Sequence, residues 1–156
     1  MTKKIVVAGS GFAGMWAAIS AARAVALSGR EQEVEVTIVS PSATLTIRPR
    51  LYEAILENMN PDIAPLLDAV GVRHIAGLVR TIDADARRVW IEHVDGTRKR
   101  LSYDKFVLAT GSHLFRPSVP GLADHAFDVD QLASARALDA HLKALADRPE
   151  TIARNT

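Results

Sequence analysis

The stretch Lys4–Ala22, KIVVAGSGFAGMWAAISAA, decides the fold. It opens with the apolar run Ile5–Ala8, as expected for a strand buried on both faces, and a proline-free helical stretch follows. Between them, Gly9, Gly11 and Gly14 have the spacing G-x-G-x-x-G. We expect the first glycine to permit a tight turn, the second to let a diphosphate approach the backbone, and the third to let the helix lie close to the strand. The N–H groups at the helix start would then face the phosphates. The stretch predicts a dinucleotide-binding turn; the alternative is a glycine-rich turn that binds nothing.

The composition is that of an ordinary globular protein with one domain. Of 156 residues, 48% are hydrophobic and 24% charged, and the formal net charge is +1. This balance gives no electrostatic reason to expect nucleic acid as a partner, and we interpret Arg98-Lys99-Arg100 as a solvated strand end. The absence of cysteine excludes a redox-active dithiol, a thiolate–zinc site and an iron–sulfur cluster. No stretch offers the ~18 uninterrupted apolar residues of a spanning helix, so we expect a cytoplasmic protein without a transmembrane segment.

Patterns along the rest of the chain predict an α/β fold. Phe12–Ser28 should form the first helix and Val34–Val39 a second strand, joined by a right-handed crossover. Further helices are predicted at Leu51–Leu56, at Ile63–Ala69, and from an N-cap at Asp130 to Ala146.

The region from residue 72 to residue 108 is divided into short β-like segments. Strands are predicted at Val72–Val79, Thr81–Asp83, Arg88–His93 and Arg98–Ser102, with a hairpin turn at Asp95-Gly96. From these segments we expect a three-stranded antiparallel β-meander that leaves the parallel sheet. Phe106–Leu108 is apolar throughout and should return to the parallel sheet beside the first strand. The predicted fold is therefore a Rossmann-like domain, with a central parallel sheet and an antiparallel meander.

Three further places are candidate cofactor contacts. Ser40 ends the second strand, where a dinucleotide-binding unit usually has Asp or Glu for the ribose hydroxyls; its hydroxyl could bind a ribose, or the residue only ends the strand. Arg48 could pair with a diphosphate or be a surface arginine, and Arg50 is less suited. The small residues Ala109-Thr110-Gly111 end a predicted parallel strand, where a ligand can approach closely.

No pattern of catalytic or metal-binding residues is evident. The five histidines show neither i,i+4 pairing nor H-E-x-x-H spacing, and Ser10 lacks the G-x-S-x-G context of a nucleophile. His113 lies just beyond the predicted crevice, where a solvated loop histidine is the simpler interpretation than a group that tunes a cofactor. We therefore predict no catalytic side chain and no metal site.

Taken together, these motifs resemble one family. The glycine motif followed by Ala18, Tyr103-Asp104 before FVLATG, and Val119–Leu122 (VPGL) are similar to the FAD-dependent pyridine nucleotide oxidoreductases. The likeness is strongest to the NADH dehydrogenase-like branch related to type II NADH:quinone oxidoreductases. Arg48–Glu53, RPRLYE, is similar to a stretch that runs beside the flavin in such proteins.

The resemblance implies an FAD site and assigns residues to it. The diphosphate would be contacted mainly by backbone N–H groups of Gly9, Gly11, Phe12, Ala13 and Gly14. Ser40 would lie near the adenosine ribose, and the backbone of Val79 would lie near the adenine. Arg48 and Pro49 would approach the ribityl or ring portion. The floor under the cofactor would be lined by Ala109, Thr110 and Gly111. The implied reaction passes a hydride from NAD(P)H to FAD and then electrons to a quinone or similar acceptor.

Members of this family are longer, and a second glycine motif for NAD(P)H follows the Val-Pro-Gly segment and a helix. We interpret residues 1–147 as the N-terminal portion of an FAD-binding domain, and residues 148–156 as a tail leading to an absent NAD(P)-binding domain. Such a chain should turn over NAD(P)H weakly or not at all by itself, and its exposed apolar surface should favour self-association. The alternatives are a single-domain NAD(P)-binding protein and a non-catalytic half that pairs with a partner chain.

Overall fold

The computed structural model describes residues 2–146. These residues divide into two compact units. Unit 1 contains residues 2–46 and 60–112, and unit 2 contains residues 47–59 and 113–146. The predicted tail at 148–156 lies outside the described residues.

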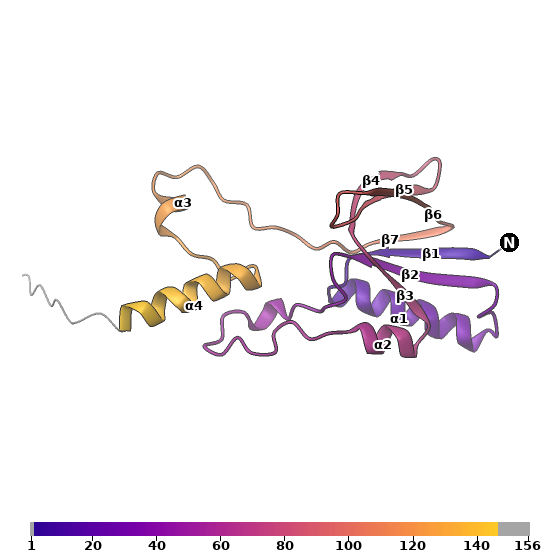
Figure 1. The fold of residues 1–156 in the computed structure, drawn as a ribbon, viewed down its shortest axis with the longest axis horizontal. Helices are drawn as coiled ribbons and strands as arrows, with labels where there is room; N and C mark the ends of the chain where they lie inside the picture. Colours follow the sequence, from indigo (N-terminus) through magenta and orange to yellow (C-terminus); the bar gives the residue numbers. More distant parts are fainter. Residues whose placement is uncertain (1, 147–156) are drawn as a thin grey trace, which may run out of the picture. The chain divides into compact units, whose positions relative to one another are not determined.

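Four parallel strands form the centre of unit 1 (Figure 1). In the order β3-β2-β1-β7 across the sheet, their bounds are Val72–Ala76, Val34–Ser40, Lys3–Ala8 and Lys105–Leu108. Strand β7 pairs with β1 in parallel, so the prediction that the last apolar run returns beside the first strand is confirmed. Because side chains alternate along β1, Val7 faces one side of the sheet and Val6 the other, and both are fully buried.

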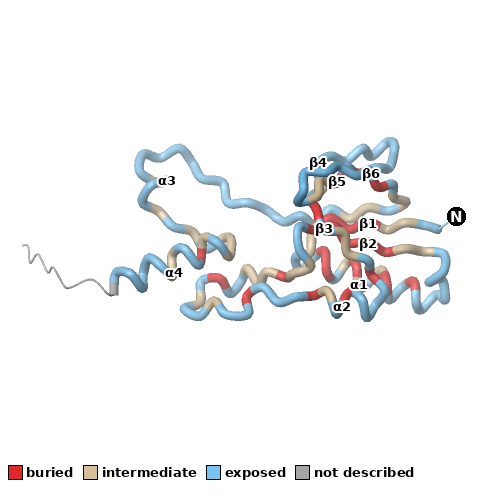
Figure 2. Tube along the Cα trace, viewed as in Figure 1, coloured by how far each residue is buried: buried red, intermediate tan, exposed pale blue. Residues whose placement is uncertain are grey.

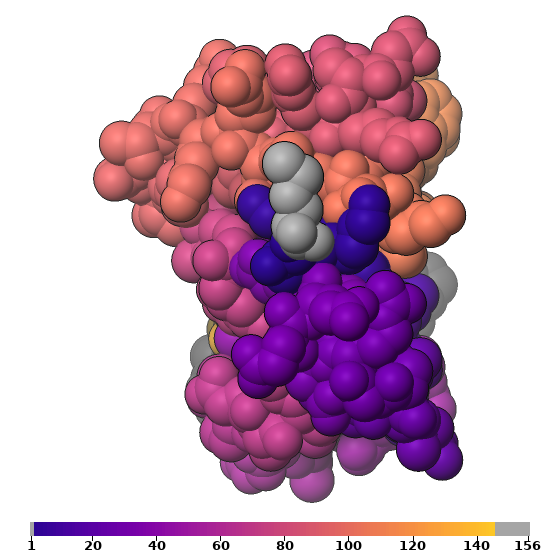
Figure 3. Space-filling view, turned by 90° about the vertical axis from the view of Figure 1, so that its right-hand side faces the viewer, coloured from indigo at the N-terminus to yellow at the C-terminus, as the bar shows by residue number. Residues whose placement is uncertain are grey.

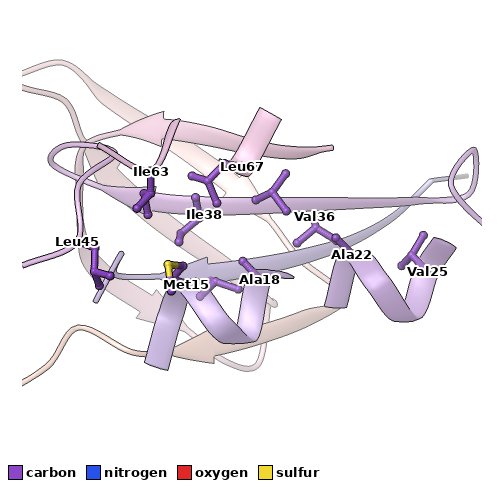
Figure 4. Close-up of a cluster of buried hydrophobic side chains, with 11 residues drawn as sticks. Met15, Ala18, Ala22, Val25, Val36, Ile38, Leu45, Ile63 and Leu67 are labelled. Carbon is purple, nitrogen blue, oxygen red and sulfur yellow. The ribbon is translucent and has the colours of Figure 1, made fainter. Parts of the chain in front are cut away.

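Two helices cover the face to which Val7 belongs (Figures 1 and 4). They are α1 (Phe12–Leu27) and the short α2 (Ala64–Ala69), and both were predicted at these places. The small side chains of Ala18 and Ala22 are buried, which allows α1 to lie close to the sheet. Figure 2 shows that buried residues are concentrated in β1, β2 and the inward side of α1.

The predicted antiparallel meander covers the opposite face of the sheet. Its strands are β4 (Leu78–Asp83), β5 (Arg88–Glu92) and β6 (Arg98–Ser102), in the order β4-β5-β6. Their buried side chains Val89, Ile91 and Leu101 pack with Val6 and Val39 of the parallel sheet. Figure 3 views this arrangement from the end at which β1 begins, with the meander above the indigo atoms of β1 and the violet atoms of the α1–β2 segment below.

The prediction of one continuous strand over Val72–Val79 is wrong. The chain leaves the parallel sheet at Gly77, between β3 and β4, where its N–H donates to the Ser40 carbonyl (3.0 Å). A Cβ at this position would lie 2.6 Å from Cγ2 of Ile91 and 2.9 Å from the Glu92 carbonyl oxygen. Glycine therefore lets the chain pass closely over β5 as it crosses from one sheet to the other.

Unit 2 contains three helical elements and a small core. They are the 3₁₀ turn η1 (Arg48–Arg50), α3 (Leu122–His125) and α4 (Leu132–Ala146), and Leu51, Met59 and Ala135 are the buried residues of the core. The predicted helix at Leu51–Leu56 is wrong, because this segment forms turns and bends. Only Leu51 is buried there, and the Ile47 N–H donates to the Met59 carbonyl (2.8 Å), which closes the segment into a loop.

Helix α4 confirms the predicted C-terminal helix but begins later than expected. The N–H of Ala135 donates to the carbonyl of Gln131 (3.0 Å), so Gln131, not Asp130, flanks the first turn. The Asp130 carboxylate is instead held by Arg48, which lies 82 residues earlier in the chain. Within residues 2–146, no helix is long and apolar enough to cross a membrane.

Candidate functional site

The turn after β1 is built from two very close contacts. Gly9 has a left-handed backbone (φ +103°), and its N–H donates to the Val39 carbonyl (2.8 Å). A Cβ on Gly9 would lie 2.2 Å from the carbonyl oxygen of Ala109, and one on Gly14 would lie 1.9 Å from the carbonyl oxygen of Gly9. Both distances are far below van der Waals contact. The tight turn predicted at Gly9 and the close helix–strand packing predicted at Gly14 therefore both require a residue without a side chain.

Gly11 is in a different situation. It flanks the start of α1 with an ordinary backbone (φ −64°, ψ 179°), and a Cβ built on it would meet no atom within 4 Å. Among the described residues, no side chain caps this end of α1, and its first turn contains no acidic residue. Phe12 and Ala13, which begin the helix, are exposed. A helix start with exposed N–H groups and open space before it is suited to bind an anionic group such as a diphosphate.

The second predicted motif lies directly beside this turn. Strand β7 is extended by a hydrogen bond from the Ala109 N–H to the Ala8 carbonyl (2.8 Å), so Ala109-Thr110 packs against the turn. Gly111 then takes a left-handed conformation (φ +75°). The structure thus brings together two motifs that are about a hundred residues apart, and Ala109 provides the backbone against which Gly9 is packed.

Ser40 lies at the end of β2, next to the same turn, but its hydroxyl is engaged within the protein. The residue is 2% exposed. Its Oγ donates to the Ser42 carbonyl (2.7 Å) and lies 3.0 Å from Nε2 of His74. Because the hydroxyl proton is directed to Ser42, the imidazole Nε2–H is the donor to Ser40 Oγ. No motif in the sequence indicates the contact with His74, and a role for Ser40 at a ribose stays a prediction.

Val79 follows the crossing at Gly77. It is partly buried in β4 and opposite Ile91, and the strand register shifts between Val79 and Thr81. The hydrogen bond from Gly77 to the Ser40 carbonyl ties this crossing to the end of β2. The backbone contact of Val79 with an adenine also stays a prediction.

Arg48 and Pro49 belong to unit 2, where they form the 3₁₀ turn η1. The Arg48 guanidinium forms an ion pair with the Asp130 carboxylate, and its Nε donates to the Asp130 carbonyl (3.1 Å). Asp130 also accepts from the side chain of Gln131 (2.9 Å) and from the N–H of Leu114 (3.3 Å). The bond from Gln131 and then that from Arg48 lower the pKa of the Asp130 carboxyl. The structure thus shows a carboxylate partner for Arg48 that sequence reasoning missed.

Other candidate chemistry is sparse in the part of the chain that the structure describes. Residues 2–146 contain no group of three or more His, Cys, Asp or Glu residues that could hold a metal ion. The arrangement that stands out is therefore the open helix start of α1, with the end of β7 beside it.

Comparison with known protein families identifies the family of this chain. The family model of the pyridine nucleotide-disulphide oxidoreductases matches residues 3–153. The chain belongs to this family. Its members are FAD-binding oxidoreductases, which confirms the resemblance drawn from the sequence motifs and the fold expected from them.

Individual relatives support the same family membership. The chain is 44% identical to an NADH dehydrogenase-like protein of Mycobacterium tuberculosis over 154 residues, which are 98% of this chain and 38% of the relative. It is 30% identical to the demethylphylloquinone reductase of a Synechocystis species, over 91% of this chain and 36% of the relative. The chain thus spans little more than a third of the length of these relatives.

The fold is also found among solved structures. The sulfide:quinone oxidoreductase of Aquifex aeolicus superposes with a TM-score of 0.74, at 24% identity, over 95% of this chain and 33% of that protein. A structure of NDH2 from Plasmodium falciparum gives the same TM-score at 16% identity. These two likenesses show the shared fold.

Proposed function

We propose that this chain binds FAD at the glycine turn and forms the FAD-binding portion of a flavin-dependent NAD(P)H oxidoreductase. The observation that carries the proposal is the difference among the three glycines. At Gly9 and Gly14, neighbouring backbone occupies the space that a Cβ would need. At Gly11, the corresponding space at the start of α1 is open. A Cβ at Gly11 would occupy space that the fold itself does not use, and a diphosphate bound to the helix start fits there.

The residues of this chain would bind and orient the cofactor. The N–H groups of the first turn of α1 would hold the diphosphate, and the small residues Ala109 and Thr110 would allow the cofactor to approach the end of β7. Bound FAD would supply the redox chemistry, by taking a hydride from NAD(P)H and passing electrons to an acceptor such as a quinone. No side chain of the chain is proposed to act as acid, base or nucleophile.

We further propose that residues 1–147 belong to an FAD-binding domain whose NAD(P)H site lies outside these 156 residues. The sequence contains one G-x-G-x-x-G motif, and the chain covers 38% of its Mycobacterium tuberculosis relative. On this basis, the 156-residue chain alone should show little or no NADH:quinone turnover even when it holds FAD.

The test is to measure FAD binding by the chain and by a variant that blocks the helix start. Purified protein is mixed with FAD, separated from the excess by gel filtration, and examined for absorption bands at roughly 370 and 450 nm. In Gly11→Asp, the carboxylate should cap the same N–H groups, so the helix is kept while the diphosphate is excluded. Loss of one charge-assisted hydrogen bond should raise Kd about tenfold or more.

The matched control is Ser20→Asp, which adds the same charge to the exposed side of α1. FAD binding by this control should be unchanged. If Gly11→Asp binds FAD as tightly as the unmodified chain, the diphosphate does not lie at the helix start and the proposal is wrong. A chain that binds no FAD but is saturated by NADH would instead favour a single-domain NAD(P)-binding protein.

A further inference from the structure

The outer face of the meander carries a group of charged residues unrelated to the glycine turn. Along β5, Val89 and Ile91 point inward and are fully buried, so Trp90 and Glu92 point outward. The antiparallel register places Arg100 opposite Trp90 and Arg98 opposite Glu92, and side chains directly opposite share a face. We call Arg80, Trp90, Glu92, Arg98 and Arg100 the arginine–tryptophan face.

This face has an excess of positive charge. Glu92 lies between two arginines, with Arg80 Nη2 2.8 Å from one carboxylate oxygen and Arg98 Nη2 3.2 Å from the other. The guanidinium of Arg100 lies 5.9 Å from the centre of the Trp90 ring. The face thus carries three guanidinium groups and one carboxylate. Because a guanidinium has five N–H donors and the side chains of Arg80 and Arg98 are 53% and 70% exposed, both can bind a further anion.

The same face contains a groove and borders a sheet edge. The groove has a volume of about 530 Å³ and is lined by Arg80, Thr81, Trp90, Ile91, Glu92 and Arg98. In the part of the chain that the structure describes, β6 pairs only with β5, so its other side is an edge of the sheet. Arg98 and Arg100 are two residues apart on that edge strand. A strand added beside β6 would therefore bring every second side chain next to these two arginines.

We propose that the arginine–tryptophan face binds an extended acidic segment of a partner protein, added as a strand along β6. Carboxylates at alternate positions of the segment pair with Arg98 and Arg100. Trp90, which is 41% exposed, lies behind these arginines on β5, with the Arg100 guanidinium 5.9 Å from the centre of its ring, so a carboxylate that binds Arg100 changes the surroundings of the indole. The combination of Trp and Arg is typical of protein–protein contacts. This proposal does not depend on FAD binding.

The charges favour a polypeptide over the other anionic partners. A nucleic-acid strand carries a phosphate at every nucleotide and usually stacks on several aromatic residues, whereas this face has one tryptophan and the Glu92 carboxylate in its middle. A lipid surface requires several apolar side chains that insert together, and Trp90 stands here among charged residues. A peptide can place its carboxylates beside the arginines and away from Glu92.

The experiment measures binding by the intrinsic fluorescence of Trp90. The chain has one other tryptophan, Trp16, so Trp16→Phe leaves Trp90 as its single tryptophan. A nine-residue peptide of alternating Glu and Val is titrated into this protein, and the matching Lys and Val peptide serves as the comparison. The acidic peptide should change the Trp90 emission in a saturable way, and the basic peptide should not.

Charge variants then locate the contact. Arg98→Gln with Arg100→Gln should weaken binding about tenfold, since each exposed charge pair contributes about threefold. Lys99→Gln is the matched control, because it removes the same charge from the opposite side of the same strand and should bind normally. Glu92→Gln should strengthen binding, because it removes the carboxylate that competes for the arginines.

Three results would overturn the proposal. They are the absence of saturable binding of the acidic peptide, an equal loss of affinity in Lys99→Gln, and tighter binding of a uridine oligonucleotide or of phosphatidylserine vesicles to the same face. Circular dichroism of each variant shows whether a loss of binding is instead a loss of folding.

Discussion

Gly14→Ala should destabilise unit 1 through one backbone contact. The new Cβ would lie 1.9 Å from the carbonyl oxygen of Gly9 and 2.9 Å from the carbonyl carbon. Ordinary contact begins near 3.4 Å, so α1 and this carbonyl must separate by about 1.5 Å. Gly9 cannot yield easily, because its N–H is bonded to the Val39 carbonyl and its Cα lies against the backbone of Ala109.

The expected loss follows from two opposing effects. Replacing a glycine inside a helix by alanine stabilises the helix by about 0.5–1 kcal/mol. Overpacking in a well-packed interior typically costs about 1–3 kcal/mol, and a clash with backbone belongs at the upper end of that range. We therefore expect the free energy of unfolding of Gly14→Ala to fall by about 2 kcal/mol or more, measured by urea denaturation followed by far-UV circular dichroism.

Gly11→Ser is the matched comparison for this measurement. No atom lies within 4 Å of a Cβ at Gly11, and serine is favoured at a helix N-cap, so its stability should stay within about 0.5 kcal/mol of the unmodified chain. The reasoning is refuted if Gly14→Ala is as stable as the unmodified chain. It is also refuted if Gly11→Ser loses as much stability as Gly14→Ala.

Three further predictions concern unit 1. Gly77→Ala places a Cβ 2.6 Å from a β5 side chain and should lower the free energy of unfolding by about 1–3 kcal/mol in urea denaturation. Ser40→Ala removes the hydroxyl that bonds to His74 and should cost about 1–3 kcal/mol, while its FAD affinity, measured by fluorescence titration, falls only if Ser40 also reaches the ribose. The backbone N–H of Lys4 and then Lys3 lower the pKa of Asp104, so its stabilisation is present above the unfolded pKa and is lost as the pH falls below about 4. Asp104→Asn should therefore show a smaller loss of stability than the unmodified chain when the urea midpoint is followed from pH 6 to pH 3.

The elements predicted correctly are those whose signal is local. Strand β1, helix α1 and strand β7 are marked by continuous apolar runs or by glycine spacing within a few residues. The meander was found because Asp95-Gly96 marks its hairpin. In each case the residues that decide the structure lie inside the segment itself.

The errors concern contacts between distant segments. The strand break at Gly77 depends on the close passage over β5 and on the bond to Ser40. The loop that replaces the predicted helix at Leu51–Leu56 is closed by the bond from Ile47 to Met59. No periodicity within one segment contains this information, because the partner residue and the geometry of approach both come from the folded chain.

The three glycines of the turn separate the requirements of the fold from those of binding. Gly9 and Gly14 are needed to bring β1, α1 and the end of β7 together, whether or not a cofactor is bound, since their missing side chains are replaced by protein backbone. Gly11 meets no such neighbour and could be substituted without affecting the packing. No contact in the described structure requires Gly11 to lack a side chain, as expected if the space before α1 is kept for the proposed diphosphate. For this reason Gly11→Asp tests cofactor binding, whereas substitutions at the other two glycines test the fold.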